Sequence, residues 1–185
     1  MLIPSNEDYS EAMKRLEVVG FRRTPWSYAT IDPKILPQDP ITQRVHASAI
    51  KGYAMLDAHS VRYVFPDANF DGGKVVLLQS DYVHLRPPLD DAAAINNGLF
   101  HTRSDFYWPN KILLLESFIR TLLQDGPSMW ELTLTCWAIT YVYGTLEVEA
   151  NALDNCGDEN VIAWFNNIIK RGQGGLDKTC TKRAR

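Results

Sequence analysis

Cysteine is scarce in this chain, and its few thiols are not arranged for disulfides or zinc. The 185 residues include three cysteines, Cys136, Cys156 and Cys180, and no CxxC pair. An odd number of scattered thiols argues against a disulfide framework. None of the four histidines has a second His or Cys at the spacing of a zinc ligand pair. The sequence therefore predicts free thiols in a reducing, cytoplasmic environment.

The chain also lacks the short motifs that identify common catalytic or membrane-inserted proteins. It contains no GxSxG, no GxGxxG and no P-loop, because Gly72-Gly73-Lys74 lacks both the upstream glycine and the following Ser or Thr. The first residues have neither the cationic start nor the apolar run of a signal peptide. The longest uncharged run, 132–146, is shorter than the roughly 20 apolar residues of a membrane span. We expect no membrane association, and the balance favours a protein that is not an enzyme.

Residues 1–172 lack a net positive charge. The net charge is −3, but residues 173–185 hold four cations against one carboxylate, which leaves −6 for residues 1–172. An acidic body argues against a general nucleic-acid binder, which needs a basic face. Proteins and small molecules remain as possible partners. Residues 173–185 are expected to form a flexible basic tail.

The chain contains enough apolar residues to form a core. Hydrophobic residues make up 45% of the sequence and charged residues 22%. Helical spacing favours helices that begin near Ser5, Asp39, Asp90, Ile112 and Val161. Strands are expected within 21–31 and over 61–65, 75–78 and 82–85. The pattern predicts a mostly helical α+β domain over 1–172, with a small antiparallel sheet of about three strands packed on helices.

The second predicted helix has a clear start signal. Asp39 is a good N-cap, and Pro40 suits the first helical position. The helix would continue to about Ala58. Its apolar contacts would come from Ile41, Val45, Ile50, Tyr53 and Leu56.

Residues 129–149 carry two competing signals. Ser128 and Glu131 match a capping box, which favours a helix. The alternation from Trp130 to Cys136 fits strands instead, with a turn at Gly144. We favour the helix because the flanking segments are helical, and a pair of strands remains the alternative.

Acidic oxygen donors recur at alternate positions in the segment 67–73. Asp67, Asn69 and Asp71, followed by Gly72, match the first positions of a calcium loop. The twelfth position is Leu78, which cannot ligate, so the segment is not an EF-hand. A hairpin turn between two antiparallel strands is the favoured interpretation, since Asp-Gly is a strong turn signal. A Ca²⁺ loop completed by a distant carboxylate is the alternative.

The segment after Gly98 brings three chemically useful side chains together. If it is extended, His101, Arg103 and Asp105 point the same way, because side chains alternate along a strand. Such a set could perform acid–base chemistry or bind an anion. The simpler interpretation is a surface loop whose charges pair locally.

These observations favour a protein-binding module over an enzyme. We expect an intracellular inhibitor, immunity or accessory protein that acts by occluding a partner protein, and homodimerisation is plausible. Aromatic residues in loop-like segments are the expected anchors of the contact, namely Trp26, Tyr28, Tyr107 and Trp108. The alternatives are a small enzyme or anion binder that uses His101, Arg103 and Asp105, and a domain stabilised by Ca²⁺.

Overall fold

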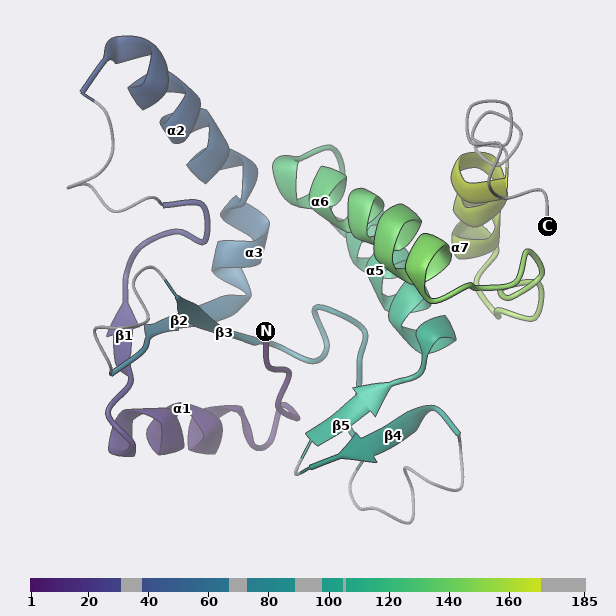
Figure 1. The fold of residues 1–185 in the computed structure, drawn as a ribbon, viewed down its shortest axis with the longest axis horizontal. Helices are drawn as coiled ribbons and strands as arrows, with labels where there is room; N and C mark the ends of the chain where they lie inside the picture. Colours follow the sequence, from purple (N-terminus) through teal and green to yellow (C-terminus); the bar gives the residue numbers. More distant parts are fainter. Residues whose placement is uncertain (31–37, 67–72, 89–97, 105, 171–185) are drawn as a thin grey trace. The chain divides into compact units, whose positions relative to one another are not determined.

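The computed structural model describes residues 1–30, 38–66, 73–88, 98–104 and 106–170, and it confirms the α+β class. These residues form helices and two antiparallel sheets, of three and two strands (Figure 1). Contacts gather in two compact units. The first comprises Met1–Pro87 and Pro127–Trp130, and the second comprises Pro88–Gly126 and Glu131–Arg185. The prediction of one domain over 1–172 stays a prediction, and the tail at 173–185 lies outside the described residues.

The helices of the first unit begin and end near their sequence signals. Helix α1 (Tyr9–Val18) is followed by Gly20, whose φ of 94° is left-handed, as expected of a helix end. Helix α2 (Pro40–Gly52) begins after Asp39, whose carboxylate accepts hydrogen bonds from two backbone N–H groups of the first turn. Helix α3 (Ala54–Ala58) then follows as a separate short helix. The single helix expected over 39–58 is therefore two helices.

The expectation that Ile41 and Val45 pack against a core is wrong. Their side chains are 74% and 63% exposed, and α2 contains no buried residue, whereas Leu56 of α3 is fully buried. Within the first unit, α2 extends away from the sheet and α3 adjoins it (Figure 1). The apolar repeat of α2 is real, but its N-terminal half lies beyond the reach of the strands.

The three-stranded sheet belongs to the first unit. Its order is β1 (Arg22–Thr24), β2 (Ser60–Val64) and β3 (Lys74–Leu78), with antiparallel pairing throughout. Strands β2 and β3 flank the segment 67–73, as predicted. Leu2 adds a parallel bridge to the outer side of β3, through bonds of 2.8 Å from its N–H to the Val76 carbonyl and 2.9 Å from the Leu78 N–H to its own carbonyl.

The strand expected at 82–85 is wrong, because this segment is a turn. His84 has a left-handed φ of 53°, and the Leu85 N–H donates to the Ser80 carbonyl. Alternation predicted the burial of Val83 and Leu85 and the exposure of His84 correctly, but Tyr82 is buried as well. A further strand has no place beside β3, because Leu2 already pairs with that edge. The third strand of the sheet is β1.

The second unit contains a hairpin followed by helices. Strands β4 (Phe100–Arg103) and β5 (Phe106–Pro109) precede α5 (Lys111–Asp125). Helix α6 (Met129–Trp137) continues as a π-helix, η1 (Ala138–Thr145), and α7 (Glu159–Trp164) continues as η2 (Phe165–Lys170). The helical interpretation of the segment after Ser128 is confirmed, and the alternative pair of strands is wrong. The short helix expected over 90–97 lies outside the described residues.

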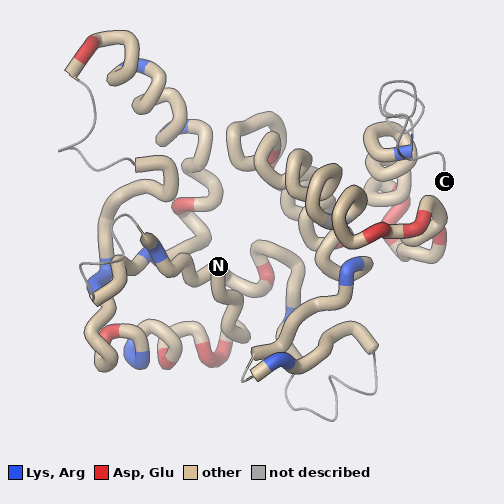
Figure 2. The backbone as a smooth tube through the Cα atoms, in the orientation of Figure 1, with Lys and Arg blue, Asp and Glu red and all other residues tan. Residues whose placement is uncertain are grey.

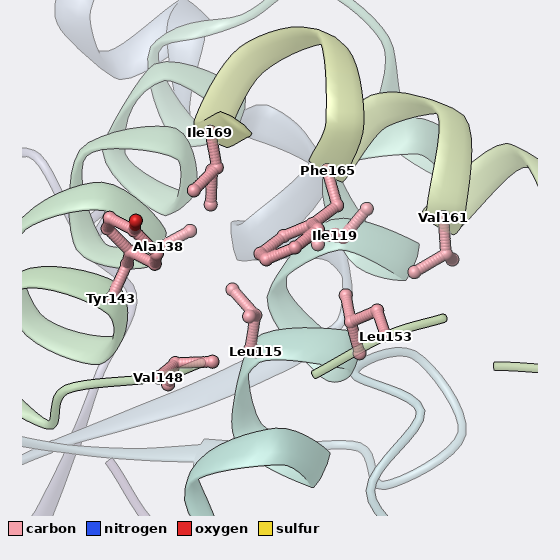
Figure 3. Packing of buried hydrophobic residues seen from close by; sticks show 9 residues of the cluster. All are labelled: Leu115, Ile119, Ala138, Tyr143, Val148, Leu153, Val161, Phe165 and Ile169. Atoms are coloured by element: carbon pink, nitrogen blue, oxygen red, sulfur yellow. The ribbon is translucent and has the colours of Figure 1, made fainter. Parts of the chain in front are cut away.

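The helices of the second unit enclose an apolar core (Figure 3). Leu115 and Ile119 of α5 and Phe165 of η2 are fully buried. Arg120 joins the same helices, because it pairs with Glu116 at 2.8 Å and with Asp158, the N-cap of α7, at 2.7 Å. The complete cluster is Leu115, Ile119, Ala138, Tyr143, Val148, Leu153, Val161, Phe165 and Ile169.

Candidate functional site

The most prominent aromatic surface described in the second unit is on the β4–β5 hairpin. Its strands are rich in aromatic residues, which favour extended backbone. The register pairs His101 with Trp108 and Arg103 with Phe106. Two residues connect the strands, and the first, Ser104, has a left-handed φ of 55°. Such a conformation is typical of the tight turns that join adjacent antiparallel strands.

One face of this hairpin presents a cation, an imidazole and two aromatic rings. Because side chains alternate along a strand, the paired residues His101, Trp108, Arg103 and Phe106 share a face. We call these four residues the hairpin face. Phe106 is 55% and Trp108 is 50% exposed, and His101 and Arg103 are also exposed. The prediction that His101 and Arg103 share a side is confirmed, whereas Asp105 lies outside the described residues.

The opposite face of the hairpin is less accessible. Tyr107, expected as an anchor, belongs to this second face and is only partly exposed. Phe100 and Pro109, on the same face, are also partly buried. The hairpin face is therefore the more exposed of the two, although Thr102 of the second face, the partner of Tyr107, is also exposed.

Asn110 holds the base of the hairpin against helix α5. Its amide oxygen accepts a bond of 2.8 Å from the Leu113 N–H and so caps the helix. Its amide nitrogen donates to the Gly98 carbonyl at 2.8 Å, and its backbone N–H donates to the Leu99 carbonyl at 2.7 Å. One residue thus fixes both the start of α5 and the ends of the hairpin strands.

The two other expected anchors lie in the first unit. Trp26 is 40% exposed. Tyr28 instead packs in an aromatic cluster, with ring centroids 5.2 Å from Tyr53 and 6.5 Å from Trp130. Burial, followed by the proximity of Tyr53, raises the pKa of Tyr28 above its usual value. These contacts give Tyr28 a structural role within its unit.

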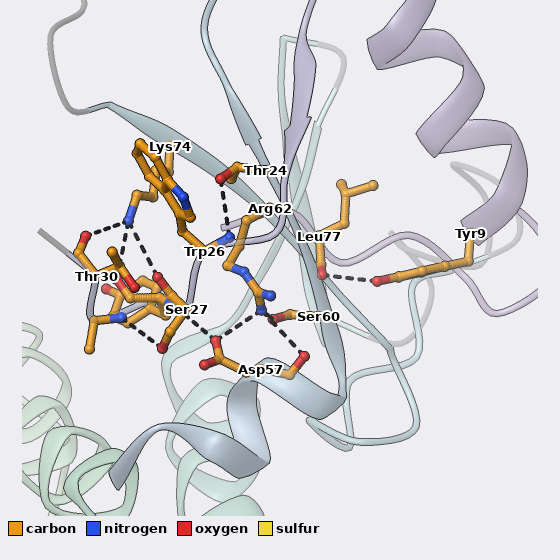
Figure 4. A network of polar contacts seen from close by, with 12 residues as sticks. Tyr9, Thr24, Trp26, Ser27, Thr30, Asp57, Ser60, Arg62, Lys74 and Leu77 are labelled. Carbon is orange, nitrogen blue, oxygen red and sulfur yellow. Dashed lines mark hydrogen bonds and ion pairs between the residues drawn. The ribbon is translucent and has the colours of Figure 1, made fainter. Parts of the chain in front are cut away.

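A polar network beside Tyr28 was not foreseen from the sequence (Figure 4). Arg62 lies at the centre of β2, is 9% exposed, and pairs with Asp57 at 2.9 Å. The same carboxylate oxygen of Asp57 accepts the Tyr28 N–H at 2.8 Å. A signal was available in the sequence, because a cation between two apolar residues of a strand must find a partner when it is buried.

Lys74 completes the network at the start of β3. Its ammonium group donates to the carbonyls of Ser27, Tyr28 and Thr30 at 3.5, 3.5 and 3.0 Å. Burial, and then the nearby charge of Arg62, lower the pKa of Lys74. Lys74 therefore holds the segment after β1 against the sheet. These three bonds use the three N–H donors of its ammonium group.

The metal hypothesis finds no further support in the described residues. Across these ranges, no three His, Cys, Asp or Glu side chains gather closely enough to hold a metal ion. Asp67, Asn69 and Asp71 lie outside them, so the Ca²⁺ alternative stays a hypothesis. Within the same ranges, every helix is too short or too polar to cross a bilayer.

Comparison with known proteins gives no relative. No protein family model, curated protein or solved structure matches this chain. Its function must therefore be inferred from its own surfaces, and the hairpin face presents solvent-facing aromatic rings beside a cation.

Proposed function

We propose that this chain is a non-enzymatic protein-binding module whose hairpin face contacts a partner protein. The observation that carries the proposal is the exposure of Phe106 and Trp108, at 55% and 50%, on adjacent strands. A two-stranded ribbon is only marginally stable alone, so large apolar rings on its open face gain from being covered. Aromatic and arginine side chains are also the residues that most often dominate binding energy at interfaces.

The charge on the hairpin face defines the kind of partner that would fit. Arg103 carries a permanent positive charge, and it forms no ion pair with a carboxylate among the described residues. A partner segment with an acidic side chain next to an apolar one would match both Arg103 and the rings. We therefore propose an acidic, partly apolar segment of another protein as the occupant.

The open geometry supports binding more than catalysis. His101 and Arg103 lie on an exposed ribbon, where water competes for every hydrogen bond, whereas acid–base chemistry gains from a water-poor site. An inhibitor, immunity or accessory protein that occludes its target in the cytoplasm fits this surface. A second copy of the chain is the competing occupant.

Capture from the native host, followed by purified binding, tests the proposal. The bait variants are Phe106→Ser with Trp108→Ser, and the matched control is Leu132→Ser, a 50% exposed apolar residue of α6. We expect one protein to be captured by the original chain and the control but lost with the double variant. Measured with the purified protein, the double variant should weaken the affinity by at least about tenfold.

Charge reversal tests the chemistry of the partner. Arg103→Glu should weaken binding and reduce its salt dependence, whereas Arg86→Glu, at an exposed ion pair with Asp81, should not. Equal loss in both variants would contradict an acidic contact at Arg103. A concentration-dependent dimer that the double variant abolishes would show that the hairpin face binds a second copy of the chain and not another protein. If a metabolite and no protein co-purified with the bait, the result would favour the alternative of a small enzyme or anion binder.

A further inference from the structure

A cavity at the end of strand β1 is the feature from which a second site can be inferred. Strand β1 stops at Thr24, which pairs with Arg62, while β2 extends back to Ser60. Pro25 follows, and it cannot continue the ladder because proline lacks an N–H. The result is an open cavity of about 460 Å³, which we call the notch. Its lining residues are Arg23, Thr24, Pro25, Ser60, Val61 and Arg62.

Hydrogen-bond donors outnumber acceptors in the side chains that line the notch. The Nε–H of Arg62 is buried and has no acceptor among the described residues. The Ser60 hydroxyl accepts from Arg62 at 3.0 Å, and the Thr24 hydroxyl accepts from the Trp26 N–H at 3.2 Å, so both hydroxyl protons are left to donate. Thr24 and Ser60 are only 7% and 8% exposed. Buried donors without acceptors are complemented by a ligand that accepts hydrogen bonds.

The charge around the notch has the same sign. The three strands contain Arg22, Arg23, Arg62 and Lys74 and no Asp or Glu, in a chain whose net charge is −3 (Figure 2). Asp57 balances Arg62, but Arg22, Arg23 and Lys74 form no ion pair with a carboxylate among the described residues. The sheet is therefore a local basic patch on an acidic chain, which attracts anions.

We propose that the notch binds a small molecule through an oxyanion group, either a carboxylate or a phosphate. The register places Thr24, Ser60 and Arg62 on one face of the sheet, where the two hydroxyls and the Arg62 Nε–H supply the donors. The volume is within the range of small-molecule sites, so the ligand is larger than a bare ion. This site belongs to the first unit and does not depend on the hairpin face of the second.

Titration with inorganic phosphate, sulfate and acetate, followed by backbone amide NMR at constant ionic strength, tests the site. We expect saturable shifts at Thr24, Ser60 and Val61 with at least one anion by about 10 mM. Ser60→Ala removes one of these donors and should weaken that binding at least about tenfold. Ser80→Ala is the matched control, since it removes a hydroxyl from another buried serine of the same unit outside the notch lining, and it should change binding by less than about twofold.

A second pair of variants separates ligand contacts from folding. Thr24→Val removes the hydroxyl and should weaken anion binding, while Thr24→Ser restores it. Unfolding in urea, measured for each variant, excludes simple loss of structure. Equal weakening by Ser60→Ala and Ser80→Ala would reduce the effect to loss of structure and overturn the site, as would the absence of saturable shifts with all three anions.

Discussion

The three-stranded sheet and the β4–β5 hairpin use similar residue types in opposite ways. Tyr63, at the centre of the sheet, is fully buried and donates its hydroxyl proton to Glu17, whereas Phe106 of the hairpin is 55% exposed. In the sheet, Arg62 pairs with Asp57, whereas Arg103 of the hairpin faces solvent. The difference teaches that charged and aromatic residues in the sheet stabilise the fold, while those of the hairpin remain available to another molecule.

Among the polar and charged residues, the largest expected effect comes from breaking the ion pair within the sheet region. Asp57→Ala leaves the Arg62 guanidinium buried without its counter-charge, and it also removes the acceptor of the Tyr28 N–H. Loss of one partner of a buried pair costs about 3–5 kcal/mol, because the remaining charge is uncompensated. We expect the free energy of unfolding in urea to fall by about 3 kcal/mol or more.

A matched exposed pair provides the control. Arg15 and Glu11 form an ion pair in α1, with side chains 79% and 52% exposed. Glu11→Ala should lower the free energy of unfolding by less than about 0.5 kcal/mol, because water screens this pair. If Asp57→Ala lowered the free energy of unfolding no more than Glu11→Ala does, the Arg62–Asp57 pair would not stabilise the fold. The contrast between the sheet region and the hairpin would then be wrong.

A smaller effect is expected where the hairpin joins α5. Asn110→Ala removes the helix cap and the bond to the Gly98 carbonyl, at an expected cost of about 1–2 kcal/mol. Asn110→Asp keeps the capping oxygen but loses the donor, so it should retain most of the stability of the helix. Hydrogen exchange should then be faster in the hairpin strands than in α5. If exchange became faster to the same extent in the hairpin strands and in α5, the Asn110 donor would have no separate role in holding the hairpin.

The hairpin face itself should matter least for folding. Trp108→Ala is expected to change the free energy of unfolding by less than about 0.5–1 kcal/mol, because half of the ring is already in water. Phe165→Ala, at a fully buried position of the second core, should cost about 3–5 kcal/mol. A large loss for Trp108→Ala would assign the ring to the core and remove the observation on which the proposed function depends.

Local signals in the sequence identified most elements of the fold. Asp39-Pro40 and Gly20 mark helix boundaries because caps and left-handed glycines are local properties. The strand at 82–85 was predicted wrongly because apolar residues on both sides of His84 also suit a buried turn, in which Tyr82, Val83 and Leu85 all lose contact with water. The local pattern also could not show that Leu2, which is far away in the chain, pairs with the outer edge of β3.

The candidate sites were less predictable than the fold. That His101 and Arg103 share a face follows from alternation alone, but their solvent exposure depends on how the hairpin packs. Ile41 and Val45 show the same limit, since helical spacing cannot tell whether anything covers the stripe. The notch arises from where β1 stops relative to β2, which is a matter of register between segments far apart in the chain.

The smallest effect concerns alkaline pH and separates the first unit from the hairpin. Burial raises the pKa values of Tyr9, Tyr28 and Tyr63 above 10.0, so the folded chain resists their ionisation. The unfolded chain ionises first, and the stabilisation is therefore complete below pH 10.0 and is lost as the pH rises through the folded values. Tyr28→Phe keeps the ring contacts and should make this loss shallower in urea unfolding.

Lys74 contributes with the opposite sign. Its pKa is lowered from 10.5 by burial first and Arg62 second, so the cost of burying its charge is relieved as the pH rises through the lowered value. Lys74→Met removes this compensation, and the alkaline loss should become steeper than in the original chain. Phe106→Ala in the hairpin should leave the pH dependence unchanged. An equal change in slope from Phe106→Ala would show that alkaline unfolding begins in the second unit, because Tyr9, Tyr28, Tyr63 and Lys74 all belong to the first.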